Sequence, residues 1–166
     1  YHLAFHDHLT GLINRPMFYD IFMKEIQNAK VENKSLIVAI INIDDLKKVN
    51  DEFGHEEGDK VIKETAQRLK NVVRGSDIVS RLGADEFAVV LNGIIDYTGI
   101  GIITQRIHDV FNDNYIICNT LYPVKASMGV SVFPKDADSV EELMRKADFA
   151  LSQAKMKGKN RIVMSS

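Results

Sequence analysis

The hydrophobic positions of the chain recur with two periods, and these predict where helices and strands lie. Apolar side chains return at helical spacing in three long segments, 16–30, 61–73 and 140–154. Residues 36–43 instead form an apolar run that ends in polar residues, a pattern typical of a central strand covered on both faces. Because loops at strand ends carry many functional side chains, we expect chemistry at the polar end of this run.

Shorter patterns supply the remaining elements. Residues 78–82 and 86–91 are predicted strands on either side of Gly83-Ala84-Asp85, which makes them a β-hairpin. Further elements are expected as helices at 44–53 and 100–111 and as strands at 115–121, 124–132 and 161–164. Together these elements predict an α+β fold with a central, mostly antiparallel sheet of about five strands plus a hairpin, covered by helices.

Length and composition narrow the class of protein. The 166 residues suit one domain, and the charges nearly cancel to a net charge of -2. This balance gives no reason to expect nucleic acid or an acidic membrane surface as a partner. No apolar run approaches the ~20 residues that a bilayer crossing needs, so no membrane contact is expected of this domain. The single cysteine, Cys118, lies in an apolar stretch and is predicted to be a buried core thiol rather than a reactive one.

The beginning of the chain suggests a piece of a longer protein, because its first residue is Tyr1 rather than methionine. Residues 1–6 are predicted to end a linker helix that arrives from upstream, and residues 7–166 to form the domain itself. An unpaired cysteine suits a reducing compartment, so we expect this domain to be cytoplasmic, whether or not the full-length protein is anchored in a membrane.

Two acidic clusters are the first candidates for chemistry. Asp44 and Asp45 follow the buried strand, and Asp85 and Glu86 lie at the tip of the predicted hairpin. Carboxylates at a strand end that face a hairpin tip suit divalent metals bound to phosphate oxygens. Acidic residues in turns are also commonly just solvated, so these clusters leave both interpretations open.

Three longer strings are more specific than either cluster. They are residues 7–15 (DHLTGLINR), 42–59 (NIDDLKKVNDEFGHEEGD) and 81–87 (RLGADEF). In order and spacing these strings resemble the motif blocks of GGDEF domains, the family of diguanylate cyclases, and the resemblance covers residues 6–164. It implies a palm-like or ferredoxin-like fold of the nucleotide-cyclase type.

The resemblance also implies a reaction. GGDEF domains join two GTP molecules into cyclic di-GMP with release of two pyrophosphates, so GTP and cyclic di-GMP are the implied partners. A homodimer is needed, because each domain presents one GTP and the 3′-hydroxyl of one attacks the α-phosphorus of the other. Mg²⁺ or Mn²⁺ is the implied cofactor, since metal ions neutralise the phosphates and lower the pKa of the attacking hydroxyl. An upstream sensory domain is implied for the full-length protein.

Position by position, the family motif assigns roles at the strand end and the hairpin. The implied metal ligands are Asn42, the backbone carbonyl of Ile43, and Asp85. Asp85 is also the implied proton acceptor and Glu86 accompanies it in the catalytic set. Lys47 is expected to stabilise charge in the transition state.

The implied phosphate site combines backbone and side-chain donors. Backbone N–H groups around Asp45 and Leu46, at a helix N-terminus, are expected to bind phosphate. Lys155 and Lys159 are expected to hold the β- and γ-phosphates. Lys159 stands where the family commonly has arginine, which keeps the charge and loses the bidentate fork.

Base choice is expected to depend on Asn50 and Asp59. A carboxylate accepts from the N1–H and amine of guanine, and adenine lacks this donor pair, so guanine is expected over adenine. Both residues also have structural interpretations, Asn50 as a helix-terminal residue and Asp59 as the N-cap of a helix that contains Val61.

Arg74 and Asp77 match the Arg-x-x-Asp motif by which the family binds its product and is inhibited. Arg74 would grip phosphate and guanine while Asp77 orients it. This pair is therefore the expected product-inhibition site.

The chain departs from the family at two positions of the site. Asn42 replaces the usual aspartate, so one negative charge is lost where divalent ions are expected. Ala84 replaces a glycine, which costs about 1 kcal/mol if that position needs a positive φ and nothing if it does not. The sequence leaves two hypotheses: a diguanylate cyclase with weakened activity, or a lapsed domain that binds GTP or cyclic di-GMP and regulates a neighbour.

Overall fold

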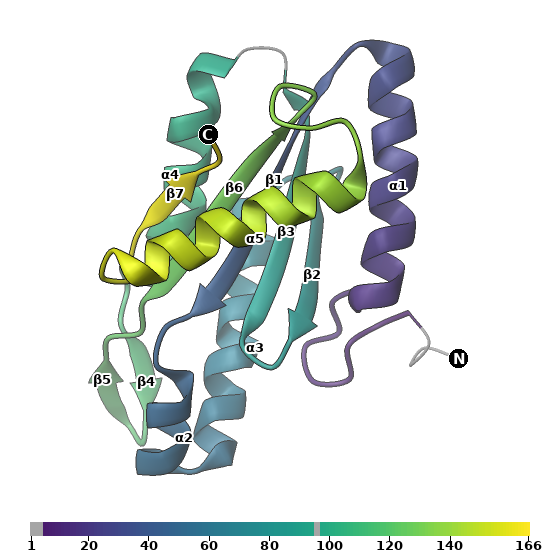
Figure 1. Cartoon of the computed structure of the whole chain (residues 1–166). Helices are drawn as coiled ribbons and strands as arrows, with labels where there is room; N and C mark the ends of the chain where they lie inside the picture. Colours follow the sequence, from purple (N-terminus) through teal and green to yellow (C-terminus); the bar gives the residue numbers. More distant parts are fainter. Residues whose placement is uncertain (1–4, 95–96) are drawn as a thin grey trace.

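Residues 5–94 and 97–166 are described by a computed structural model, in which a β-sheet carries helices on both faces (Figure 1). The helices are α1 (Arg15–Glu32), α2 (Leu46–Phe53), α3 (His55–Val72), α4 (Ile100–His108) and α5 (Val140–Met156). The strands are β1 (Ser35–Ile43), β2 (Ile78–Gly83), β3 (Glu86–Ile94), β4 (Tyr115–Ile117), β5 (Thr120–Tyr122), β6 (Ala126–Phe133) and β7 (Ile162–Met164). The predicted α+β class, with a mostly antiparallel sheet of five strands, is confirmed, and the predicted hairpin of β2 and β3 forms part of that sheet.

Strand β1 is the centre of the sheet. The strand order is β2-β3-β1-β6-β7, and β1 runs antiparallel to both of its neighbours. All nine residues of β1 are buried, as the apolar run predicts. The short strands β4 and β5 pair with each other outside this sheet.

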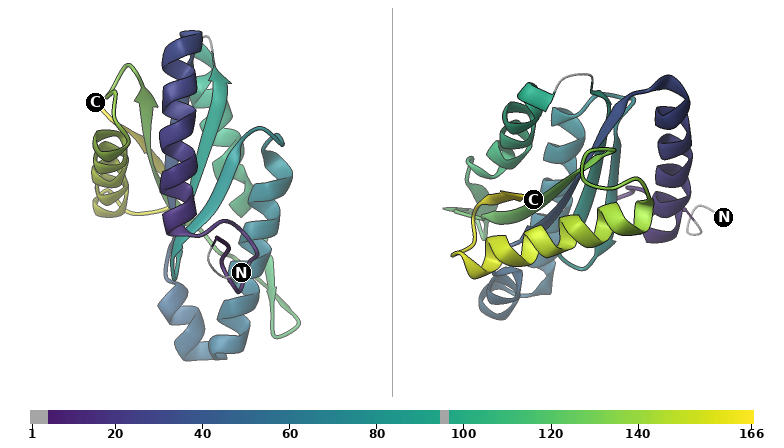
Figure 2. Two further views of the ribbon diagram at one scale, coloured as in Figure 1. Left: turned by 90° about the vertical axis from the view of Figure 1, so that its right-hand side faces the viewer. Right: turned by 45° about the horizontal axis from the view of Figure 1, so that its top comes forward.

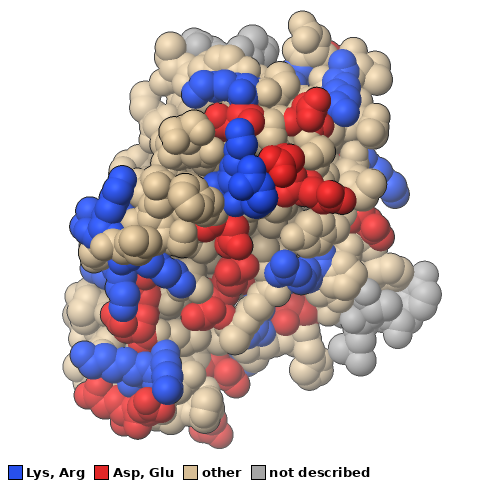
Figure 3. Space-filling model, viewed as in Figure 1, with Lys and Arg blue, Asp and Glu red and all other residues tan. Residues whose placement is uncertain are grey.

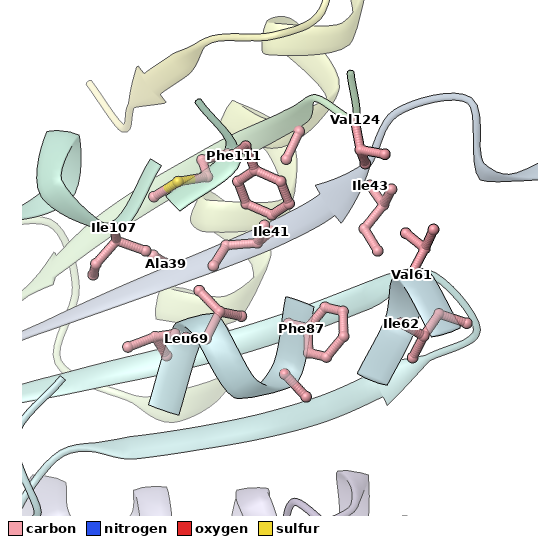
Figure 4. Packing of buried hydrophobic residues seen from close by; sticks show 14 of the residues in the cluster. Ala39, Ile41, Ile43, Val61, Ile62, Leu69, Phe87, Ile107, Phe111 and Val124 are labelled. Atoms are coloured by element: carbon pink, nitrogen blue, oxygen red, sulfur yellow. The ribbon is translucent and has the colours of Figure 1, made fainter. Parts of the chain in front are cut away.

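The side chains of β1 alternate between two apolar clusters, one on each face of the sheet. Ile41 shares a cluster with Leu69 of α3 and Ile107 of α4, and these side chains converge in Figure 4. Ile40 belongs to the other cluster, with Phe22 of α1 and Leu143 of α5. The left view of Figure 2 shows the result, a sheet with α1 and α5 on one side and α3 on the other. Burial on both faces fixes the register of β1, because a slip of one residue would exchange the two clusters.

The predicted strand at 115–121 is wrong, and so is the predicted burial of Cys118. Two short strands, β4 and β5, replace it, with Cys118 and Asn119 in the turn between them at φ values of 51° and 60°. Cys118 is exposed at this turn. Its apolar neighbour Ile116 also faces outward and is 68% exposed, so the apolar stretch is not a core strand.

The start of α3 also differs from the sequence-based expectation. The helix begins at His55, directly after Gly54, whose φ of 95° ends α2 and allows the sharp change of direction. Asp59 therefore lies inside α3, and its interpretation as the N-cap is wrong. The helix expected at 1–6 falls mainly on residues 1–4, outside the described part of the chain, while His6 forms a β-bridge with Ile13.

Charges of both signs are intermixed on the face seen in Figure 3, in keeping with the near-neutral composition. Among the residues that the structure describes, no helix combines the length and the apolar character needed to cross a bilayer.

Close packing between β6 and α5 leaves no room for a side chain at Gly129. A Cβ atom there would collide with the backbone oxygen of Ala147 and the backbone nitrogen of Leu151, both in α5. We expect Gly129→Ala to lower the free energy of unfolding by at least about 2 kcal/mol, because α5 must move away from the sheet.

Gly101→Ala is the matched control for this test. A Cβ at Gly101 would meet nothing within 4 Å, and alanine is the better helix former in α4. Chemical denaturation of both variants checks the contrast, and equal stabilities would contradict the close contact of α5 with β6.

Candidate functional site

The polar end of β1 meets the tip of the β2–β3 hairpin. The backbone N–H of Ile43 donates to the carbonyl oxygen of Asp85 at 2.9 Å. The Nδ2 group of Asn42 donates to the same oxygen at 3.4 Å, and Asn42 lies opposite Glu86 in the ladder. The three residues expected to bind metal, Asn42, Ile43 and Asp85, are therefore brought together.

The hairpin tip is a two-residue turn, Ala84-Asp85, between β2 and β3. Ala84 does not have a positive φ, so the alanine causes no backbone strain of the kind that glycine would relieve. The side chain of Arg81 donates from Nε to the carbonyl of Gly83 at 3.0 Å and from Nη2 to that of Ala84 at 2.9 Å. The turn thus keeps its shape through Arg81.

Arg81 also ties the hairpin to the N-terminal segment. Its Nη1 donates to both carboxylate oxygens of Asp7, at 3.1 and 3.2 Å. The side chains of this pair are only 14% and 20% exposed. Burial raises the pKa of Asp7, but hydrogen bonds from Thr10 and the charge of Arg81 outweigh it, so the pKa lies below its usual value.

Asp44 is committed to a structural role. Its Oδ1 accepts from the hydroxyl of Ser127 at 2.7 Å, and its Oδ2 accepts from the backbone N–H of Asn160 at 3.0 Å. Both oxygens are therefore engaged with β6 and with the loop after α5. Asp44 holds that loop beside the end of β1 instead of turning toward the hairpin.

The start of α2 carries the residues expected to meet phosphate. Asp45 precedes the helix with a left-handed φ of 59°, and Leu46 is its first, buried residue. Lys47 is exposed on the next position. Lys159, on the loop after α5, donates to Oδ1 of Asp45 at 2.8 Å, so this lysine lies at the start of α2 (the lower left of Figure 1).

Lys155 lies one turn earlier, in the last turn of α5, and is exposed. Of the two lysines expected to hold phosphate, the structure thus ties Lys159 to the start of α2 by a hydrogen bond and leaves Lys155 in contact with solvent at the end of α5.

Asn50 lies in α2 and Asp59 in α3, the two helices that meet at the α2–α3 junction. The side chain of Asn50 lies directly against Gly58, where a Cβ atom would overlap its Oδ1. Asp59 follows Gly58 and is exposed. A side chain at 58 would thus displace Asn50 from its present position, and the expected base-recognition pair lies at this junction.

Glu86 faces the side of the sheet covered by α1 and α5. It lines a depression of about 280 Å³ with Arg15, Tyr19 and Asp148 among its other walls. Burial, and next the negative charge of Asp148, raise the pKa of Glu86 above its usual value. Glu86 is thus half-buried on this side of the sheet.

Arg74 and Asp77 form a closed turn at the start of β2. Asp77, with a side chain only 3% exposed, accepts from the backbone N–H groups of Arg74 at 3.0 Å and Asn92 at 3.2 Å. The Nη2 of Arg74 donates to the carbonyl of Asn92 at 2.6 Å. Cavities of about 390 and 230 Å³ flank the turn, and Arg74 and Asp77 line both.

The β1–hairpin junction offers oxygen atoms, the donor type that hard divalent cations prefer. Its total negative charge is low for such a cation. Asp85 supplies one carboxylate, Ile43 a backbone carbonyl and Asn42 a neutral amide. In residues 5–94 and 97–166, no group of three or more histidine, cysteine or acidic side chains is placed to hold a metal. These three residues therefore offer a cation one negative charge and two neutral oxygen donors.

Sequence reasoning gave no role to several residues that build this site. Arg81, Asp7 and Thr10 belong to the motif strings, yet the bonds between Arg81 and Asp7 span 74 positions, and Thr10 supports Asp7 from three positions away. The contact of Gly58 with Asn50 was missed because α3 was expected to begin after Asp59, which left Gly58 outside the predicted helix.

Comparison with known proteins supplies the family. A family model described as diguanylate cyclase, GGDEF domain matches residues 4–161. The chain is 35% identical over 158 residues to the cyclic di-GMP phosphodiesterase NbdA of Pseudomonas aeruginosa and 34% identical over 164 residues to diguanylate cyclase TpbB of the same species. These matches cover 95% and 93% of this chain, but 20% and 36% of those proteins.

Solved structures agree with the sequence matches. The GGDEF domain of TpbB superposes with a TM-score of 0.92 at 29% identity, over 97% of this chain and 94% of that one. The coiled coil and GGDEF domain of DgcB from Caulobacter crescentus, in complex with cyclic di-GMP, gives 0.87 at 25% identity, over 99% and 87%. The chain belongs to the GGDEF domain family, and it spans about a fifth of NbdA and about a third of TpbB.

The hairpin should depend on Arg81 for its stability. We expect Arg81→Ala to lower the free energy of unfolding by about 2–4 kcal/mol, because a largely buried carboxylate and two carbonyls lose their donor. Asp7 stabilises the fold above its unfolded-state pKa, and this contribution is lost as pH falls through the lowered folded pKa. The variant should therefore show a smaller loss of stability on acidification.

Arg145→Ala is the matched control, since Arg145 pairs with Glu142 on the exposed face of α5, with side chains 63% and 50% exposed. Arg145→Ala should lower the free energy of unfolding by less than about 1 kcal/mol. Denaturant unfolding across acidic to neutral pH measures both variants, and a similar small effect for Arg81→Ala would contradict the assigned role.

Proposed function

We propose that this domain binds GTP where β1, α2 and the hairpin meet, and that it is a diguanylate cyclase with weakened metal binding. The observation that carries the proposal is the convergence of Asn42, Ile43 and Asp85, joined by hydrogen bonds to a single carbonyl oxygen. Lys47 and the start of α2 lie beside this junction. Diguanylate cyclase relatives such as TpbB support the reaction class.

Guanine recognition is assigned to the α2–α3 junction. Asn50 and Asp59 both adjoin Gly58, and the exposed Asp59 carboxylate accepts from the N1–H and exocyclic amine of the base. Adenine offers no such pair of donors on that edge, and leaving a carboxylate unpaired is costly. This pair of residues therefore selects guanine.

Phosphate binding is assigned to the start of α2 and the end of α5. Backbone N–H groups of the first turn of α2 and the side chains of Lys155 and Lys159 supply the positive ends of dipoles and the charges that a triphosphate needs. Lys47 is exposed next to them and stabilises the charge that develops on the transferred phosphoryl group.

The reacting groups are assigned to the hairpin. The carboxylate of Asp85 accepts the proton of the attacking 3′-hydroxyl and binds cation, together with the Ile43 carbonyl and Asn42. A bound Mg²⁺ or Mn²⁺ neutralises phosphate charge and lowers the pKa of that hydroxyl. Because Asn42 is neutral, the protein contributes one fewer negative charge to hold the ion.

Two copies of the domain are required, since each site holds one GTP and the reaction joins two. The known relatives are several times longer than this chain, and we propose that a neighbouring sensory domain brings the two copies together in the cytoplasm. Cyclic di-GMP is proposed to bind at Arg74 and Asp77, where two cavities adjoin a turn already closed by these residues. DgcB, a structural neighbour, has been solved with cyclic di-GMP.

A second candidate function is regulation without catalysis. Asn42 is the observation that favours it, because the loss of one carboxylate weakens metal binding without disturbing Asn50 or Asp59. One relative, NbdA, is named a cyclic di-GMP phosphodiesterase, and a domain that binds GTP without condensing it would suit control of a neighbouring enzyme. Product formation separates the two candidates.

The test is a cyclase assay on the domain fused to a dimerising coiled coil, with GTP and either Mg²⁺ or Mn²⁺. We expect slow formation of cyclic di-GMP, detected by mass spectrometry. Asn42→Asp should raise the rate by at least about tenfold, because it restores the missing charge.

Asp85→Ala is the negative control and should abolish product, while Asp51→Asn changes the charge of an exposed residue in α2 and should leave the rate near that of the parent. Product from Asn42→Asp alone would favour the regulatory candidate for the parent. Absence of product from both would refute the cyclase assignment.

A further inference from the structure

We infer that the carboxylate of Asp45 forms an ion pair with Lys159 in the domain without nucleotide. This ion pair competes with a triphosphate for the lysine and so limits how tightly the site binds it. The inference rests on the proposed function and concerns this chain's own residues at that site. Lys159 donates to Oδ1 of Asp45 at 2.8 Å, across 114 positions of sequence. The terminal phosphates of the nucleotide must displace this carboxylate before they can reach the lysine.

The backbone on both sides of the pair is fixed, so only side chains can exchange partners. Gly158, Lys159 and Asn160 have consecutive left-handed φ values of 121°, 64° and 47°. Hydrogen bonds hold this loop, from the N–H of Lys159 to the carbonyl of Ala154 at 3.0 Å and from the N–H of Asn160 to Asp44 at 3.0 Å. The Cα of Lys159 is therefore held in place while its side chain remains free to turn.

Asp45 is similarly held at its backbone. Its φ of 59° is left-handed, and its carbonyl accepts from the N–H groups of Lys48 and Val49 as α2 begins. Its side chain makes no capping hydrogen bond to the helix. The carboxylate is thus directed to Lys159 rather than to the first turn of α2.

Exposure shows why the pair can open. The side chains of Lys159 and Asp45 are 48% and 58% exposed, so water competes with the ion pair and its net strength is small. A triphosphate, with several negative charges, is a stronger partner for Lys159 than one carboxylate. Asp45 nevertheless weakens binding twice, first by competing for the lysine and second by repelling the phosphates from the start of α2.

Asp45→Asn should therefore tighten nucleotide binding. The probe is a non-hydrolysable GTP analogue with Mg²⁺, titrated by calorimetry into the full chain. We expect roughly a threefold to tenfold lower Kd than in the parent, from the lost competition and the lost repulsion. Asp51→Asn removes the same charge from the exposed side of α2 without touching Lys159, and should change Kd by less than about twofold.

Lys159→Met, alone and combined with Asp45→Asn, completes a double-mutant cycle for the ion pair. It should weaken binding, and adding Asp45→Asn to it should bring a smaller gain than in the parent, since the competition for Lys159 no longer exists. An Asp45→Asn gain no larger than that of Asp51→Asn, or a gain equally large in the Lys159→Met background, would overturn the inference.

A readout that needs no nucleotide separates this inference from the proposed function. The hydrogen bond from Lys159 to Asp45, followed by the negative charge of Asp45, raises the pKa of Lys159. NMR titration of the lysine Nζ should show that pKa fall in Asp45→Asn and stay in Asp51→Asn. An unchanged pKa overturns the ion pair itself. A lowered pKa with no binding of the analogue by any variant overturns the proposed function.

Discussion

The site depends on one contact, the hydrogen bond from the N–H of Ile43 to the carbonyl of Asp85. It closes the last step of the β1–β3 ladder and fixes a hairpin tip against a strand that is buried along its whole length. A slip of β1 by one residue would exchange its two apolar clusters, so the packing of the core fixes its register. Through the hydrogen bond from Ile43, the same packing fixes the backbone of Asp85. Arg81 then holds the tip in shape and joins it to Asp7, which gives the turn a second attachment.

The residues proposed to recognise the nucleotide lie apart from the position where the site lacks a negative charge. The α2–α3 junction, with Asn50 against Gly58, and the loop held by Asp44 are complete in hydrogen bonds and packing. The change at Ala84 leaves the turn unstrained, because that residue has no positive φ. Asn42 brings no negative charge beside Asp85, and its Nδ2 group donates to the carbonyl oxygen of that residue. The weakness that we propose for the site therefore lies in cation binding and not in its architecture.

Much of the fold could be predicted from sequence because its strongest signals are local. The buried run of β1, the turn at 83–85 and the helical periods each depend on neighbouring residues. Cys118 was misjudged because apolar neighbours suggested a core strand, whereas two left-handed residues turn the chain there and expose Ile116. Asp59 was misjudged as a cap because the true N-cap of α3 is Gly54, five residues earlier. Glycine has a low helix propensity and gave no sign of a helix start there.

Other features could not be predicted because they join distant parts of the chain. The motif strings placed Asn42 and Asp85 in one site only through resemblance to a family, and nothing local indicated that Lys159 pairs with Asp45. The sequence left Asp44 open as a metal ligand or a solvated turn residue, whereas its two oxygens accept hydrogen bonds from Ser127 and Asn160. Tertiary hydrogen bonds decide which carboxylate is available to bind a ligand and which one stabilises the fold.

The central claim, that guanine recognition is intact, is tested most directly by calorimetry of the parent domain with matched non-hydrolysable GTP and ATP analogues. We expect the guanine analogue to bind at least roughly tenfold more tightly, and Asp59→Asn to remove that preference, because the carboxylate is the acceptor for the base. Equal affinities for the two analogues, or a preference that survives Asp59→Asn, would contradict the account.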